Sequence, residues 1–160
     1  MDSGFASPYT GPVILPGIYT VDTLPAASVG NIGNYARVSD LFGDKSDLVL
    51  CSLSGAIYFW QPVRPFWPNQ GVISADQNIT LLPLKTPSIL RISGSLSANR
   101  TLTLSPSLAW PGCQFEVQMD GTLGIFGLTV VGLALGATVA LLLNGNRRFY
   151  YDGSAYQVVG

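Results

Sequence analysis

The chain of 160 residues contains no histidine, only two cysteines and few charged side chains. Without histidine it lacks the side chain that most often serves as a general base or metal ligand near neutral pH. Cys51 and Cys113 lie far apart and without CxxC spacing, which indicates neither a zinc site nor a disulfide framework. The amino terminus lacks the basic and apolar regions of a secretory signal, so we expect synthesis in a cytoplasm with both thiols reduced. We therefore expect a protein that is not an enzyme and holds no cofactor or metal ion.

Charged residues make up 11% of the chain, against about 25% in a typical soluble domain. The net charge is −1, and the eight Lys and Arg residues are spread along the chain. Because the sequence therefore has no basic cluster to contact phosphate groups, we expect no nucleic-acid partner. Hydrophobic residues reach 48%, and the mean hydropathy is +0.36. Because a small domain buries only about two-thirds of the surface of its unfolded chain, we expect the apolar excess to lie against a membrane or against other copies of protein.

One segment is long enough to raise the question of a membrane span. No charged residue occurs from Gly121 to Gly145, and a run of this length can cross a bilayer as a helix. The segment is, however, rich in threonine, valine and repeated glycine, a pattern that favours two successive buried strands over Leu123–Leu143. We prefer the buried strands and expect no contact with a membrane. A small membrane protein with a span at residues 123–143 is the alternative.

Composition divides the chain into three parts, residues 1–20, 21–69 and 70–160. Proline and glycine recur through residues 1–20 beside apolar side chains, which forbids a helix and predicts an extended N-terminal arm that becomes ordered on a neighbour. Residues 21–69 predict a small β unit with strands at Asp47–Leu53 and Ala56–Trp60. A stiff joint rich in tryptophan and proline follows these strands.

Residues 70–160 predict a module of short strands. We expect these strands at Ile79–Leu82, around Leu90 and Ile92, at Thr101–Leu104, Gln114–Met119, twice within Leu123–Leu143, at Arg147–Tyr151 and at Tyr156–Val159. Apolar and polar residues alternate most clearly in Gln114–Met119. The dipeptides Asp120-Gly121, Asn144-Gly145 and Asp152-Gly153 predict turns between strands. The sequence therefore indicates an all-β fold of short antiparallel strands and hairpins, arranged as a module like a β-sandwich or β-prism.

Two patterns that resemble functional sites have simpler explanations. Asp40, Asp44 and Asp47 match neither the residue order nor the closing glutamate of a calcium-binding EF-hand, so we interpret them as solvated loop carboxylates. Asn78 and Asn99 each begin an Asn-X-Thr glycosylation pattern. That pattern has no use in a chain without a secretory signal.

The second half of the chain resembles the β-rich module that recurs in bacteriophage head-decoration proteins and tail fibres. The resemblance rests on the sequence segments ILRISGSLSANRTLTLSP, GCQFEVQMDG, GLTVVG and NGNRRFYYDGSAYQVV. The segment LPAASVGNIGNYARVSDLFGDKSDLVLCSLSGAIYFWQPV resembles small phage structural units that end in a strand, a turn and a strand. The resemblance implies a virion surface protein that forms homotrimers, with apolar strands buried around a threefold axis.

The function implied is that of a cement, or decoration, protein on the outer surface of a phage capsid. Such a trimer clamps neighbouring major capsid subunits and stabilises the shell by mass action on the assembled state. The residues expected to contact the capsid are Phe5, Tyr9, Ile14, Ile18, Tyr19, Phe59, Trp60, Phe66 and Trp67. The residues expected at the trimer interface are Phe115, Val117, Met119, Ile125, Leu128, Val130, Leu133, Val139 and Leu141.

The alternative function is adsorption, in which a tail fibre or head fibre binds a glycan on the host surface. It predicts an exposed aromatic and polar groove, with Trp60, Trp67 and Trp110 as the candidate platform. Large aromatic residues beside proline more commonly anchor packing contacts, which is why we rank this alternative second. A host-surface glycan is accordingly a candidate partner after the chain itself and the major capsid protein.

Overall fold

The computed structural model describes residues 11–64, 70–141 and 145–159, which form three β-sheets and contain no α-helix. Sheet A has the order β1-β2-β3-β4, with β1 (Ile14–Tyr19), β2 (Tyr35–Leu41), β3 (Lys45–Ser54) and β4 (Ile57–Pro62). Sheet B has the order β13-β12-β9-β7-β5, with β5 (Gln70–Ser74), β7 (Ile89–Ser93), β9 (Gln114–Met119), β12 (Asn146–Tyr151) and β13 (Tyr156–Val159). Sheet C has the order β11-β10-β8-β6, with β6 (Ile79–Leu81), β8 (Arg100–Leu104), β10 (Leu128–Val131) and β11 (Val139–Leu141). Two short 3₁₀ turns, η1 (Val21–Thr23) and η2 (Ala134–Gly136), complete the elements. The all-β prediction is confirmed.

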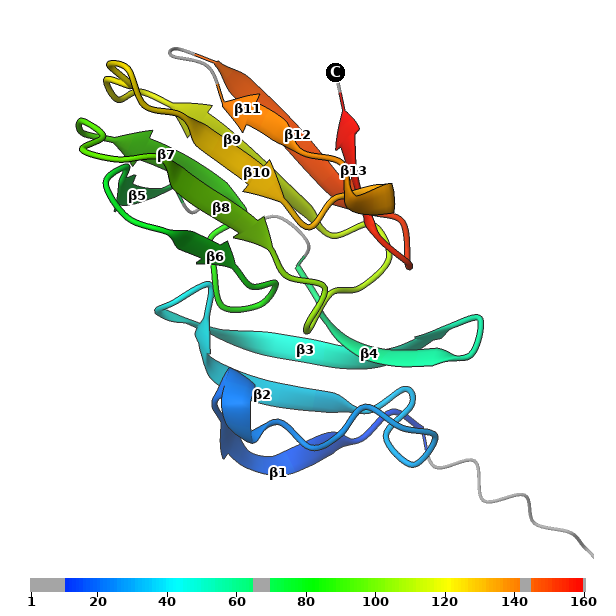
Figure 1. Ribbon diagram of the computed structural model, residues 1–160. Helices are drawn as coiled ribbons and strands as arrows, with labels where there is room; N and C mark the ends of the chain where they lie inside the picture. The colour runs from blue at the N-terminus through cyan, green and yellow to red at the C-terminus, as the bar shows by residue number, and fades with distance from the viewer. Residues whose placement is uncertain (1–10, 65–69, 142–144, 160) are drawn as a thin grey trace, which may run out of the picture.

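Sheets B and C are built by a chain that passes alternately from one to the other (Figure 1). β5, β7 and β9 pair in parallel within sheet B, while β6, β8 and β10 pair in parallel within sheet C. Each pair of successive strands is therefore one coil of a short, two-sided β-solenoid, and each coil stacks on the previous one. At the carboxyl end, β11 pairs antiparallel with β10, and β12 and β13 extend sheet B antiparallel to β9.

The predicted antiparallel pairing of short strands in hairpins is therefore wrong for the coils and right at the carboxyl end. Asp120-Gly121 is no hairpin turn, because β9 and β10 belong to different sheets. Asp152-Gly153 does close the hairpin of β12 and β13, whereas Asn144 lies outside the described residues. Polar turns between alternating strands look the same in sequence whether the next strand returns beside the last one or crosses to the facing sheet.

Most side chains that were expected at a trimer interface lie inside the core of this single chain. Seven of the expected residues are buried between sheets B and C, namely Phe115, Val117, Met119, Leu128, Val130, Leu133 and Leu141. Val139 packs against the same core, whereas Ile125 is 93% exposed. The solenoid buries them because alternate residues of each strand point to the facing sheet. These seven side chains are covered without a second copy, whereas Ile125 stays exposed to a neighbour.

The segment Leu123–Leu143 does not form one helix. Its described part contains β10, η2 and β11, as the preferred interpretation predicted, while residues 142 and 143 lie outside the described range. Across residues 11–64, 70–141 and 145–159, the structure has no helix long and apolar enough to cross a membrane.

Sheet A and the segment that follows β1 enclose a second, smaller core. Its buried residues are Val21, Ala36, Val38, Leu41, Phe42, Val49, Cys51, Trp60 and Leu84. β1, which was expected to belong to an extended arm, pairs in parallel with β2 as an edge strand of this sheet. Pro16 is tolerated there because an edge strand does not need every N–H for its ladder. The described part of the predicted arm is thus built into sheet A.

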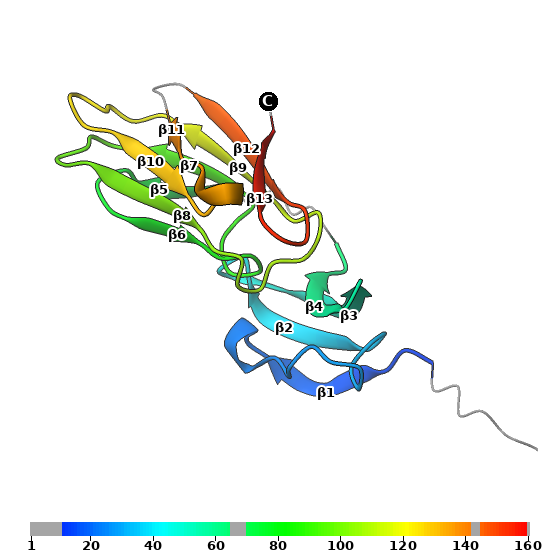
Figure 2. The same cartoon turned by 45° about the vertical axis from the view of Figure 1, so that its right-hand side comes forward.

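Leu84 and Trp110 pack sheet A against the solenoid. Leu84 lies in the loop between β6 and β7, yet it is buried in the core of sheet A, and its carbonyl oxygen accepts the N–H of Phe42. Trp110, in the loop before β9, packs against both cores. Both ribbon views place sheet A beneath sheets B and C, at the end of the coils where these loops lie (Figures 1 and 2).

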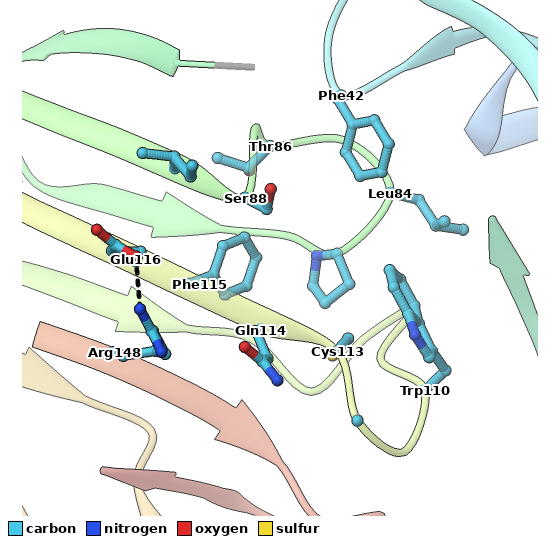
Figure 3. A pocket seen from close by; sticks show the side chains of 13 residues that line it. Phe42, Leu84, Thr86, Ser88, Trp110, Cys113, Gln114, Phe115, Glu116 and Arg148 are labelled. Atoms are coloured by element: carbon cyan, nitrogen blue, oxygen red, sulfur yellow. Dashed lines mark hydrogen bonds and ion pairs between the residues drawn. The ribbon is translucent and has the colours of Figure 1, made fainter. Parts of the chain in front are cut away.

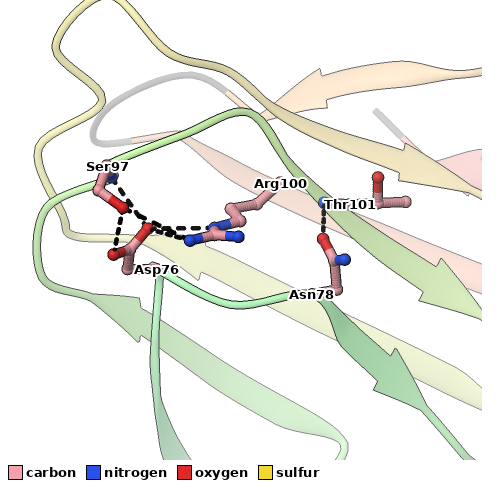
Figure 4. Close-up of polar contacts among 5 residues, drawn as sticks. All are labelled: Asp76, Asn78, Ser97, Arg100 and Thr101. Atoms are coloured by element: carbon pink, nitrogen blue, oxygen red, sulfur yellow. Dashed lines mark hydrogen bonds and ion pairs between the residues drawn. The ribbon is translucent and has the colours of Figure 1, made fainter.

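Polar side chains in the turns link consecutive coils of the solenoid. The Asn78 Oδ1 atom accepts the backbone N–H of Thr101 at 3.0 Å (Figure 4). One coil further along, the Asn99 Oδ1 atom accepts the N–H of Gly127 at 2.9 Å. The asparagines of the two Asn-X-Thr patterns therefore satisfy backbone donors of the next coil, which is a structural role.

Asp76 sits at the centre of a second link between coils. Its carboxylate accepts the backbone N–H of Ser97 at 2.9 Å, the hydroxyl of the same residue at 2.7 Å, and a guanidinium N–H of Arg100 at 2.9 Å (Figure 4). These hydrogen bonds favour the ionised carboxylate, those of Ser97 most strongly, and lower the pKa of Asp76 to about 2.

The close approach of the coils yields a first prediction, at Gly121. A Cβ atom on this residue would overlap the carbonyl oxygen of Gly94 in the turn of the preceding coil. We expect Gly121→Ala to lower the free energy of unfolding by about 1–3 kcal/mol, because the backbone must move to admit the methyl group. Gly127→Ala is the matched control, since its Cβ would lie 3.9 Å from Asn99 Oδ1, which is an ordinary contact. Urea denaturation measures both, and equal effects would contradict the stacking of these turns.

A second prediction concerns the acid stability that Asp76 confers. The pKa of Asp76 is about 2 in the folded chain and about 3.9 in an unfolded one. The carboxylate therefore stabilises the fold above about pH 4, and this contribution is lost as the pH falls toward about 2. We expect Asp76→Asn to be less stable than the native chain near pH 7 and to lose less stability between about pH 4 and 2. Thermal unfolding measured across this pH range checks the prediction, with Asp44→Asn as the control. If the stability of Asp76→Asn and of the native chain fell by the same amount between about pH 4 and 2, the prediction would be contradicted.

Candidate functional site

A cavity of about 440 Å³ lies where sheet A meets the solenoid (Figure 3). We call it the junction cavity. One wall is apolar and comes from three separate loops, because Phe42 follows β2, Leu84 follows β6 and Trp110 precedes β9. Figure 3 shows these side chains on one side and Glu116 and Arg148 on the other. The cavity exists because Leu84 and Trp110 hold sheet A against the ends of the coils.

The other wall belongs to the outer face of sheet B. On β9 the odd-numbered residues point into the core, so Gln114, Glu116 and Gln118 point outward. The register of β12 places Tyr150 opposite Gln114, Arg148 opposite Glu116 and Asn146 opposite Gln118. These six residues form a strip that we call the polar ladder, and its end at Gln114 and Glu116 lines the junction cavity.

Glu116 is the electrostatic centre of this wall. Its Oε1 atom accepts the Asn146 amide at 2.9 Å and the Gln118 amide at 3.1 Å, and its Oε2 atom accepts an Arg148 guanidinium N–H at 3.2 Å. The hydrogen bonds from Asn146, then Gln118, and the neighbouring guanidinium lower the pKa of Glu116. The carboxylate is therefore ionised at neutral pH and is held in place as a hydrogen-bond acceptor.

The cysteine that lines the junction cavity is not an activated nucleophile. Cys113 lines the wall, but its thiol is buried, and this burial raises the pKa of the thiol. A raised pKa keeps the sulfur protonated and unreactive at neutral pH. Within the described parts of the chain, no group of three or more His, Cys, Asp or Glu side chains is placed to hold a metal ion.

A second cavity, of about 710 Å³, lies on the other side of Leu84. It is bounded by residues 21–27, by the residues of β4 and by residues 106–109 and 111 before β9. Phe59 and Trp60, which were expected to contact the capsid, line it and are 9% and 6% exposed. The indole N–H of Trp60 donates to the carbonyl oxygen of Pro25 at 2.7 Å. Trp60 is thus a core residue of the first unit, which corrects its expected role as a contact.

Sheet A also presents an outward apolar surface. The β2–β3 and β3–β4 registers put Tyr35, Leu48 and Leu50 on the face opposite the core, and these three half-buried side chains belong to neither core. The same face carries the exposed apolar residues Ile14, Ile18 and Ile57, and the exposed Arg37, which the registers place between Ile18 and Leu48. We call the six apolar residues of this face the open face of sheet A.

Of the residues expected to contact the capsid, the structure leaves two exposed. Ile14 and Ile18 are 48% and 69% exposed, whereas Tyr19 packs against the smaller core. Phe5, Tyr9, Phe66 and Trp67 lie outside the described residues. The expectation missed the apolar residues of β3, although the run Leu48–Cys51 is apolar at odd and even positions alike. Such a run marks a strand whose two faces are both suited to burial.

Comparisons with known proteins identify no family. No family model matches the chain, and no curated protein matches it. The solved structure of a chaperone-substrate complex contains a chain with 14% identity and a TM-score of 0.42, matched over 88% of this chain and 30% of its own length. This chain therefore spans about a third of the length of that protein. A likeness at this level assigns no function.

Proposed function

We propose that the protein is a structural protein of a bacteriophage virion, a trimeric cement or decoration protein that clamps neighbouring major capsid subunits on the outside of the shell. The observation that carries this proposal is the open face of sheet A. Six apolar side chains share that face and contribute to no core of the chain. An exposed group of apolar side chains on a small domain, here interrupted by Arg37, is typical of a protein contact site.

The open face and the solenoid have separate tasks in this proposal. Sheet A docks onto the shell, while the stacked coils form the body of the decoration. Because Leu84 and Trp110 pack sheet A firmly against the solenoid, the two parts act as one piece when bound. Many copies then stabilise the shell, since a protein that binds only the assembled state shifts the equilibrium toward it.

The outer face of sheet C is the surface best suited to the threefold contact. Its strand residues are uncharged, and the ladder pairs Thr80 with Thr103 and Thr101 with Thr129, beside Val131. The outer face of sheet B, in contrast, carries charged side chains such as Glu116 and Arg148. Packing three uncharged sheet faces together avoids the cost of burying charge. We place the trimer axis beside sheet C for this reason.

The trimer is tested by its mass in solution. We expect light scattering on the intact chain to give about three times 17.0 kDa. Thr103→Glu should reduce the mass to that of a single chain, because it brings three carboxylates together at the axis. Val72→Glu, at a 66% exposed position on the outer face of sheet B, should leave the trimer intact. A native mass of 17.0 kDa would contradict the trimer.

Docking is tested with two matched surface substitutions. Ile18, on the open face, is 69% exposed, and Val72, on the outer face of sheet B, is 66% exposed. Both belong to edge strands, so a lysine at either position is tolerated by the fold. We expect Ile18→Lys to weaken binding to shells of the parent phage that lack this protein by about tenfold or more, and Val72→Lys by less than about twofold. Co-sedimentation measures both, and equal binding by the two variants would contradict the assignment of the open face.

A further inference from the structure

The junction cavity and the polar ladder carry an inference that goes beyond a role in the shell. We propose that this site binds a neutral saccharide, with one sugar ring in the cavity and further rings along the ladder. The site lies on different surfaces from the open face of sheet A and from the outer face of sheet C. The experiments on sugar binding and on docking can therefore fail independently of each other.

The apolar wall matches one side of a sugar ring. A pyranose has a face of C–H groups that packs on aromatic and aliphatic side chains. The cavity offers the half-buried Trp110 for this contact, beside Phe42 and Leu84, which are 6% and 0% exposed and present little surface of their own. Trp110 is fixed by packing against both cores. A ligand that stacks on it does not have to order a free side chain, which lowers the entropic cost of binding.

The polar wall matches the hydroxyl groups at the rim of the same ring. Glu116 receives three donors from the chain, and a carboxylate has about four lone-pair sites, so acceptor capacity remains. Arg148 is 54% exposed and has five N–H donors, of which one nitrogen is directed to Glu116. Gln114, exposed at the end of the ladder, adds an amide that both donates and accepts.

The balance of charge selects against anions. The carboxylate of Glu116 and the guanidinium of Arg148 form a pair at 3.2 Å, so the polar wall carries no net charge. A phosphate or carboxylate ligand would meet Glu116 as well as Arg148 and gain little. An uncharged ligand rich in hydroxyl groups can use both partners of the pair at once.

The size of the site indicates more than one sugar. The cavity of about 440 Å³ falls within the range of typical small-molecule sites. From its mouth the polar ladder continues over sheet B through Gln118 and Asn146, which present further amides. An oligosaccharide that extends from the cavity would therefore keep hydrogen-bonding partners, and its affinity should exceed that of the single sugar.

The test is saturation-transfer NMR and calorimetry on the intact chain with D-glucose, D-galactose, N-acetyl-D-glucosamine and L-rhamnose. Matching trisaccharides and inorganic phosphate complete the set of probes. We expect at least one sugar to bind with a dissociation constant on the order of 1–10 mM, and its trisaccharide to bind more tightly. Binding should shift the indole signal of Trp110. Absence of binding by every sugar, or competition by phosphate, would overturn the proposal.

Two substitutions then locate the site. Gln114→Ala removes an exposed amide, and Glu116→Gln replaces the carboxylate with a group of the same shape, so neither change disturbs the core. We expect each to weaken sugar binding by about fivefold or more. Thr80→Ala, on the outer face of sheet C, is the control and should bind as the native chain does. Unchanged affinity in both ladder variants would overturn the proposal, and urea denaturation verifies that each variant is folded.

Discussion

The parallel stacking of three coils is the interaction on which the rest of the structure depends. Because the chain crosses between sheets B and C after each of the strands β5 to β9, the apolar side chains on the two inner faces pack into one core. The turns must then lie on top of one another, which leaves no room for a Cβ at Gly121 or Gly132. Side chains such as Asn78 and Asp76 satisfy the exposed backbone and hold the turns together. In a solenoid each coil contacts only the coils before and after it, so the stability of the fold depends on these contacts.

Sheet A depends on the solenoid in turn. Its core is small and is completed by Leu84, which the solenoid supplies from the loop after β6. The contact that closes this core also creates the junction cavity between Phe42, Trp110 and the end of sheet B. It covers one face of sheet A and leaves the other face open. The same packing therefore accounts for both the proposed docking surface and the proposed sugar site.

Local pattern was sufficient to predict individual strands. The alternation in Gln114–Met119 gave the bounds of β9 as observed, and Asp152-Gly153 gave the last hairpin. Local pattern could not predict pairing partners, since a turn does not encode whether the next strand returns or crosses. The expected antiparallel sheet and the expected interface at Phe115 and Leu128 were both consequences of that ambiguity. Once the strands face each other across two sheets, those residues are buried by their own chain.

The residues of the candidate site could not be predicted from local sequence pattern either. Phe42, Glu116 and Arg148 are far apart in the sequence, and only the register of β9 with β12 and the packing of Leu84 bring them together. The high apolar content of the composition predicted correctly that apolar side chains would remain at the surface. Part of it fills the solenoid, and part remains on the open face, where Ile18 and Ile57 are exposed. What the composition could not show was the division of apolar residues between these two places.

Electron cryo-microscopy tests the proposed role most directly, applied to the virions in which we propose that this chain is a structural protein. We predict threefold density on the outer surface of the shell, with the open face of sheet A against neighbouring capsid subunits, and sheet C toward the axis. The polar ladder on sheet B should face solvent. A virion without this chain, or a bound chain whose open face points into solvent, would contradict the account.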